Sequence, residues 1–224
     1  MRTTARSFVI RAVGAAALGA LLPFAPASAS VKDLGGGWEV QSGNDELLDA
    51  VTDFVSLSAN VLVIEKFAEF YGLDDSTDLP YPLDLTFRQN APDAQTVTRI
   101  VITDEVVFNN SSLTWTAFSM KLLGASGGPS TVATFNQAQS ASFSFEPFTS
   151  RAYSAGSTRV DFTGGTIAGG AFWTPGLRAG GLVIQADLSD RLPAEFTLRE
   201  LPVPGPGATA LLALAGLIGS RRRR

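Results

Sequence analysis

Short apolar segments recur along the middle of the chain, and glycine, proline, asparagine or serine separates each from the next. Residues 83–87 alternate between apolar and polar, while 61–64 are continuously apolar, which is typical of a buried strand. The same criteria predict strands at 61–64, 83–87, 96–103, 113–122, 141–145, 158–162, 182–188 and 196–201. This spacing predicts an all-β fold, an antiparallel, jelly-roll-like β-sandwich of about eight to ten strands.

One region fits two structures. Leucine, valine and phenylalanine between residues 47 and 55 fall on one helical face, with Asn44 or Asp45 as a cap. The β-branched residues Val51, Thr52 and Val55 favour a strand instead. We therefore expect a strand here.

The first 29 residues have the pattern of a secretory signal peptide. Three arginines precede an apolar stretch at 13–22, and Ala27-Ser28-Ala29 is a small-x-small cleavage site. The mature chain is then expected to begin at Ser30. No twin arginine is present, so the general secretion machinery is the expected partner. The alternative is an uncleaved N-terminal anchor.

The last 24 residues have the pattern of a membrane signal. Residues 207–220 are uncharged and would form a helix of about 21 Å, which spans a bilayer that thins around it. Prolines at 202, 204 and 206 should keep the helix from starting earlier. Four arginines follow and would stop transfer on the cytoplasmic side, namely Arg221, Arg222, Arg223 and Arg224. The alternative is a buried C-terminal core helix.

These patterns divide the chain into a signal peptide at 1–29, a β-sandwich domain at 30–201 and a sorting signal at 202–224. The sandwich would thus be flanked by a signal-peptide helix and a transmembrane helix. All 21 acidic but only ten of the 17 basic residues fall between 30 and 201, so this body carries a net charge of −11. Such a surface repels nucleic acid, which we do not expect as a partner.

The chain contains no histidine and no cysteine. This composition excludes Ser-His-Asp and Cys-His catalysis and histidine-ligated zinc. It also excludes disulfides, although an exported protein could form them. We therefore expect no cofactor and no enzymatic activity.

Carboxylates offer three weak candidate sites. Asp74, Asp75 and Asp78 supply oxygen ligands for calcium, but they lack the spacing and the glycine of an EF-hand, so a solvated turn is favoured. The pairs Asp45-Glu46 and Asp104-Glu105 resemble glycosidase carboxylates in type only, because neighbours on a strand point to opposite faces.

Other polar and aromatic residues offer further candidates. Ser119 and Lys121 would share a strand face as a serine–lysine couple, although a surface pair is favoured. The run 109–112 (NNSS) contains glycosylation sequons but is expected to be a turn. Core or rim packing is favoured, and a sugar-stacking platform is the alternative, for Trp38, Trp115, Trp173, Tyr71, Tyr81 and Tyr153.

The tail resembles the PEP-CTERM sorting signal of Gram-negative bacteria, in which a VPEP-like motif precedes a short membrane helix and a basic end. Here the motif is Val203-Pro204-Gly205-Pro206, with Gly205 in place of the family's glutamate. The resemblance implies processing by an exosortase-type transpeptidase. The body is also similar to domains that accompany such tails, at 36–39, 64–70, 86–89 and 109–118. This second resemblance implies a β-sandwich and no known catalytic residues.

We therefore expect an exported, non-enzymatic protein of the cell envelope or extracellular matrix, held by its C-terminal helix and released or transferred after processing. A surface carbohydrate-binding module with glycan partners is the first alternative. A secreted hydrolase is a weaker one.

Overall fold

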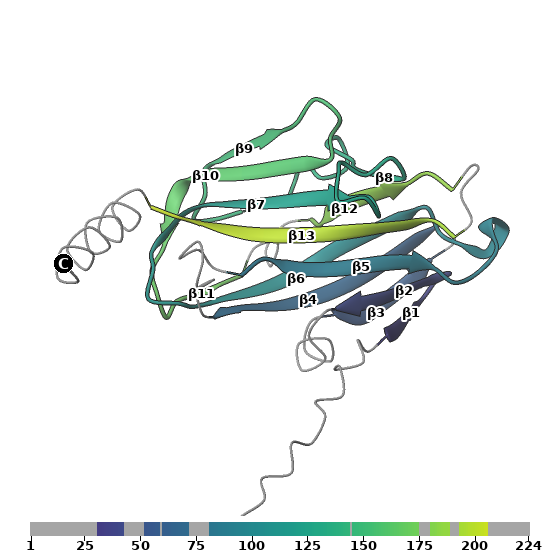
Figure 1. The fold of residues 1–224 in the computed structure, drawn as a ribbon, viewed down its shortest axis with the longest axis horizontal. Coiled ribbons are helices and arrows are strands. Elements are labelled where there is room, and N and C mark those ends of the chain that lie inside the picture. The colour runs from purple at the N-terminus through teal and green to yellow at the C-terminus, as the bar shows by residue number, and fades with distance from the viewer. Residues whose placement is uncertain are drawn as a thin grey trace, which may run out of the picture.

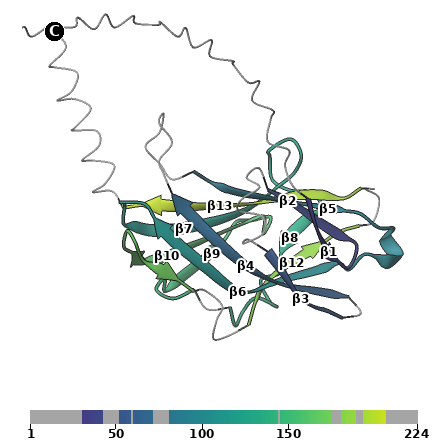
Figure 2. The same ribbon diagram turned by 90° about the horizontal axis from the view of Figure 1, so that it is seen from below.

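The computed structural model describes residues 31–42, 52–58, 60–71, 81–143, 145–174, 180–188 and 193–205. These residues form two β-sheets and one short 3-10 helix, arranged as a β-sandwich (Figures 1 and 2). The strands are β1 Val31–Gly35, β2 Trp38–Ser42, β3 Thr52–Ser58, β4 Val61–Tyr71, β5 Leu83–Gln89, β6 Arg99–Asn110, β7 Trp115–Leu123, β8 Ala133–Phe135, β9 Ser150–Tyr153, β10 Arg159–Ile167, β11 Phe172–Trp173, β12 Leu182–Ala186 and β13 Glu195–Pro204. The helix η1 spans Asp93–Gln95.

The two sheets differ in how their strands pair. The seven-stranded sheet has the order β1-β2-β5-β13-β7-β10-β9 and is antiparallel throughout. The six-stranded sheet has the order β3-β4-β6-β12-β8, with β11 beside β6, and its β4 and β6 are parallel. The prediction of a wholly antiparallel, jelly-roll-like sandwich is therefore wrong at this pair. After β4 the chain crosses to the seven-stranded sheet, forms β5 there and returns to form β6. Because of this crossover, β4 and β6 run in the same direction.

Most predicted strands are present, with shifted ends. The strand favoured over a helix near residue 52 is confirmed as β3, while residues 43–50 lie outside the described residues. The strand predicted at 141–145 is wrong, because this segment consists of turns among its described residues. Phe143 and Phe145 are nonetheless buried there, so both phenylalanines reach the core without a strand.

The core lies between the two sheets and follows the alternation of each strand. On β4, Leu62 and Ile64 are buried while Val61 and Val63 are half-buried, so the continuously apolar segment does not form a strand buried on both faces. Phe70 of β4 meets Trp115 and Phe118 of β7 edge-on, with ring centroids 5.4 and 5.7 Å apart. Aromatic packing thus joins the six-stranded to the seven-stranded sheet.

One ion pair crosses this apolar core. Lys66 occupies an inward position of β4 and Glu200 an inward position of β13, and both side chains are fully buried. The Lys66 Nζ donates to Glu200 Oε2 at 2.8 Å. Desolvating two charges costs several kcal/mol per ion, and the close contact offsets that cost only while both partners are present. The pair therefore specifies how β4 and β13 face each other.

We predict that Lys66→Met lowers the free energy of unfolding by about 3–5 kcal/mol, because the Glu200 carboxylate then stays buried without its lysine. The double variant Lys66→Met/Glu200→Met should recover most of this loss, since it buries no charge. Urea denaturation of a chain spanning Ser30–Gly205 measures both. Equal losses in the single and the double variant would show that packing volume, rather than charge, decides stability at this point.

Candidate functional site

The predicted sorting motif, residues 203–206, begins within β13 of the sandwich rather than after the last strand. Strand β13 continues past the expected boundary at Leu201 to Pro204, and Val203 is in register with Ala117 of β7. Pro204 is in register with Trp115 after a shift in the pairing. The Gly205 N–H then donates to the Thr114 carbonyl oxygen at 3.0 Å. Three of the four motif residues are therefore described as part of the fold, and Pro206 lies outside the described residues.

Prolines occur in β13 only where the strand has one neighbour. Strand β5 pairs with β13 from Glu195 to Glu200, whereas β7 pairs with it as far as Pro204. Beyond Glu200, the described residues pair with β13 on the β7 side alone. Edge positions tolerate proline because its missing amide donor leaves no ladder partner unsatisfied. Pro202 and Pro204 are buried and Val203 is exposed, so this segment keeps the alternation of a strand.

The structure accounts for Gly205 at the position where the resembling family has glutamate. A Cβ atom at this position would lie 2.8 Å from Cγ2 of Thr116. The methyl group sits on a short, β-branched side chain, which has little freedom to move away. A larger residue at 205 would therefore push the end of β13 away from β7.

A buried asparagine organises the loops beside this strand end. Asn109 is fully buried, and its Nδ2 donates to the carbonyl oxygens of Leu113, Ala168 and Ile167 at 2.8, 3.1 and 3.3 Å. Its Oδ1 accepts from the N–H and the hydroxyl of Ser111 at 3.1 and 2.6 Å. The sequence predicted only a turn at 109–112. In the structure residues 109 and 110 are instead the last two of β6, and Asn109 fastens the turn that follows the strand to the β10–β11 loop.

The same asparagine positions an exposed aromatic pair. Its backbone N–H donates to the Ala171 carbonyl oxygen at 3.0 Å, and its carbonyl accepts from Gly170 at 2.7 Å. Phe172 of β11, which follows Ala171, is 65% exposed and stacks on Phe108 of β6 with ring centroids 4.3 Å apart. Figure 1 shows β11 toward the same end of the sandwich as the end of β13. Sequence reasoning missed this pair.

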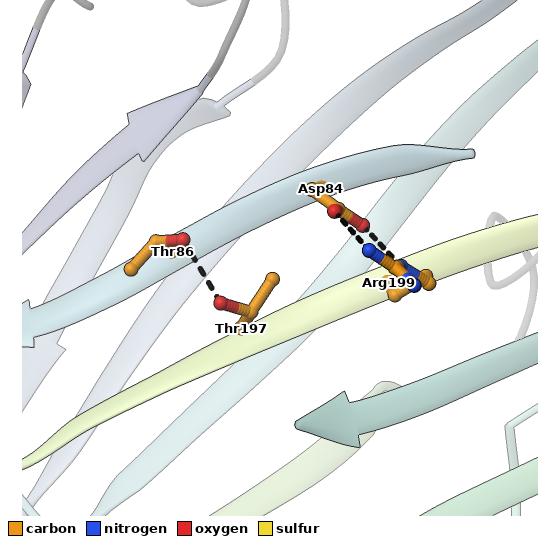
Figure 3. A network of polar contacts seen from close by, with 4 residues as sticks. All are labelled: Asp84, Thr86, Thr197 and Arg199. Carbon is orange, nitrogen blue, oxygen red and sulfur yellow. Dashed lines mark hydrogen bonds and ion pairs between the residues drawn. The ribbon is translucent and has the colours of Figure 1, made fainter. Parts of the chain in front are cut away.

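The outer face of the seven-stranded sheet carries a ladder of polar contacts. Arg199 of β13 donates from Nε and Nη2 to the two oxygens of Asp84 on β5, at 2.7 and 2.6 Å (Figure 3). These hydrogen bonds raise the pKa of Arg199 above its ordinary value. One row along, the hydroxyls of Thr86 and Thr197 lie 2.9 Å apart (Figure 3). Such contacts align neighbouring strands.

The serine–lysine couple is not assembled, and the favoured interpretation of a surface pair is wrong for Ser119. Ser119 and Lys121 both lie on β7, but Ser119 is almost fully buried and its hydroxyl has no hydrogen-bond partner among the described residues. A serine without a bonded base remains a weak nucleophile.

The three tryptophans do not form a sugar-stacking platform. Trp38 and Trp115 are fully buried and Trp173 is 4% exposed. The indole N–H of Trp38 donates to the Val97 carbonyl oxygen at 2.9 Å, and that of Trp173 to the Glu146 carbonyl oxygen. The favoured interpretation, core packing, is therefore confirmed for all three. Tyr153 is half-buried, Tyr81 is half-exposed, and the side chain of Tyr71 lies outside the described part of the chain.

The carboxylate candidates are mostly undescribed. Asp74, Asp75 and Asp78 lie outside the described residues, as does the pair Asp45-Glu46. Asp104-Glu105 lies within β6 at a register shift opposite Glu65 and Lys66, so the regular alternation expected there is interrupted. Within the described ranges, no group of three or more carboxylates is placed to hold a metal ion.

A small cavity of about 230 Å³ opens beside the β8–β9 connection. It is lined by Phe143, Phe145, Phe148, Thr149, Ser150 and Arg151. The Arg151 guanidinium donates to the Ser140 carbonyl oxygen at 2.7 Å, so it braces the loop. The cavity contains no carboxylate and no activated nucleophile among its lining residues.

Comparison with known proteins gives no match, whether with family models, curated sequences or solved structures. The likeness to a sorting signal therefore depends on residues 203–206 and the segment after them. The expected helix at 207–220 lies outside the described residues, and none of the described segments forms a helix that could cross a membrane.

We predict that Asn109→Ala lowers the free energy of unfolding by about 2–3 kcal/mol, because several buried carbonyl groups lose their donor. The matched control is Asn110→Ala. Asn110 is exposed and donates only to Glu69, at 2.7 Å, so its replacement should change stability by less than about 0.5 kcal/mol. Urea denaturation compares the two, and equal effects would contradict the role assigned to Asn109.

We also predict that Gly205→Glu loosens the end of β13, and that adding Thr116→Ser restores it by removing the obstructing methyl group. The measurement is the hydrogen-exchange protection factor of the backbone amide at position 205. Thr116→Ser alone serves as the control and should match the wild type. Unchanged protection in Gly205→Glu alone would show that the contact with Thr116 does not limit this position.

Proposed function

We propose that this chain is an exported, non-enzymatic protein of the cell envelope or extracellular matrix. A signal peptide at 1–29 directs it to the general secretion machinery, and cleavage after Ala29 leaves Ser30 as the first residue. A C-terminal helix at 207–220 then holds it in the membrane, with Arg221–Arg224 on the cytoplasmic side. An exosortase-type transpeptidase processes the tail, leaving the protein membrane-anchored or extracellular.

The observation that carries this proposal is the direct connection between the fold and the motif. Strand β13 belongs to the sandwich through Pro204, and the uncharged run begins only three residues later, at Gly207. A buried C-terminal core helix would need a docking surface on the domain. The chain offers instead a short apolar run with four arginines behind it, which is the order of a stop-transfer segment.

The chemistry of the body supports a non-enzymatic role. The chain has no histidine or cysteine, and its tryptophans are in the core. The polar groups on the outer face of the seven-stranded sheet satisfy each other across strands, as Arg199 and Asp84 do. With the tryptophan platform gone, no observation favours the carbohydrate-binding alternative over a structural role.

We predict that Leu212→Asp/Leu214→Asp releases the protein from the membrane fraction, because each charge at mid-bilayer costs about 2.5–3.5 kcal/mol on insertion scales. The matched control is Val31→Asp/Leu57→Asp, which adds the same charges at exposed apolar positions of the body. The control should stay in the membrane fraction. Fractionation that retains the tail variant in the membrane would reject anchoring by residues 207–220.

A further inference from the structure

The sandwich has almost no linker to the proposed membrane helix. Gly205 is still hydrogen-bonded to Thr114, so Pro206 alone separates the fold from the run that starts at Gly207. One or two extended residues span about 7 Å at most. The end of the sandwich where β13 finishes must therefore lie at the surface of the bilayer while the helix is inserted.

Exposed apolar side chains lie toward this same end, on both outer faces of the sandwich. Three of the five large apolar residues that are exposed in the described part of the chain lie here, namely Tyr81, Phe172 and Val203. Val203 faces outward from the seven-stranded sheet near the end of β13, because Pro202 and Pro204 are buried, and Phe172 faces outward from the six-stranded sheet, because Trp173 is buried. Tyr81 lies two residues before Leu83, which is in register with Glu200. Phe172 is tied to this end by a chain of hydrogen bonds that runs from Gly205 to Thr114 and from Leu113 through Asn109 to Ala171.

The position of the stacked pair Phe172 and Phe108 is fixed by its surroundings. Phe172 stacks on Phe108 with an interplanar angle of 14°, and the loop before it is fastened by the buried Asn109. A fixed, protruding phenylalanine suits insertion at the boundary between headgroups and acyl chains, where aromatic side chains concentrate. The acidic body gives no general electrostatic attraction to anionic lipid, so this contact would be apolar.

We propose that the end of the sandwich bearing Phe172, Phe108, Tyr81 and Val203 is a lipid-contact surface that seats the domain on the outer face of the membrane. This inference rests on the proposed anchoring and adds which surface of the domain faces the lipid. The partner is the headgroup and upper acyl region of a bilayer.

The test adds one tryptophan at one or the other end of the sandwich, in two separate variants of the chain from Ser30 to Arg224, each reconstituted in phosphatidylcholine vesicles. Residues 1–29 are left out so that their apolar stretch does not bind the vesicles. Phe172→Trp reports on the proposed surface. Leu57→Trp is the matched control, because Leu57 is 48% exposed and lies beside Gly36 at the opposite end, about 30 Å away along β13. Lipids brominated near the top of the acyl chain quench tryptophans that reach them, and the wild type supplies the background of its three buried tryptophans.

We expect the emission added by Phe172→Trp to be largely quenched and that added by Leu57→Trp to be unchanged. Vesicle flotation, run on the same samples, separates the two proposals. If the chain floats with vesicles but Phe172→Trp is not quenched, or if both reporters are quenched alike, the lipid-contact surface is overturned and anchoring stands. If the chain does not float, anchoring fails and this inference fails with it.

Discussion

The arrangement of the two sheets is most constrained where Lys66 and Glu200 are buried together, because separating them would leave an unpaired charge in the core. The pair joins β4 of one sheet to β13 of the other through a core whose inward rows are mostly apolar. A shift of β13 by one residue would expose Phe196 and Leu198 and turn Arg199 toward the core, so only one register is compatible with burial. This register also determines where Val203, Pro204 and Gly205 emerge from the fold.

If residues 203–206 are a sorting motif, as we propose, its processing depends on how the end of β13 is attached to the fold. Strand β13 lies between β5 and β7 in the seven-stranded sheet (Figure 1). Its last four residues, 201–204, extend past the first residue of β5 and, among the described residues, pair with β7 alone. A processing enzyme that acts on the motif in an extended form has to detach this short stretch from β7, or approach it from the β5 side. Because the described residues pair with β13 on the β7 side alone beyond Glu200, fewer ladder hydrogen bonds hold this stretch than hold the beginning of the strand. The strand end is thus attached to the domain yet easier to release than its beginning.

The sequence predicts the regular parts of the fold well, because alternation is a local property. Residues 83–87 and 196–201 alternate clearly, and both lie in strands of the antiparallel sheet. The parallel pairing of β4 with β6 could not be predicted, since it depends on which sheet receives the intervening β5. The two-residue strand β11 is too short to leave a pattern. At 141–145 the phenylalanines reach the core from turns, and periodicity alone cannot separate turns from a strand.

The candidate site likewise has features that the sequence reveals and others that only the tertiary structure reveals. The motif 203–206 is visible in the sequence, whereas its attachment to β7 and the contact between Gly205 and Thr116 require the tertiary structure. Lys66 and Glu200 are 134 residues apart, and from the sequence alone each has the pattern of an ordinary surface charge. Only the tertiary structure brings them together in the core. Asn109 sits in a polar run typical of a turn, yet it is fully buried. For the tryptophans the sequence favoured core packing but left a platform open, because aromatic type alone does not reveal which side of a sheet a residue occupies.

We propose that both ends of this chain are targeting signals and that the sandwich between them is the exported domain. The most direct measurement is the intact mass of the mature protein, isolated from cells that produce it. The account predicts a chain that begins at Ser30 and lacks Arg221–Arg224. A mature protein with the mass of the whole chain from Met1 to Arg224 would contradict it.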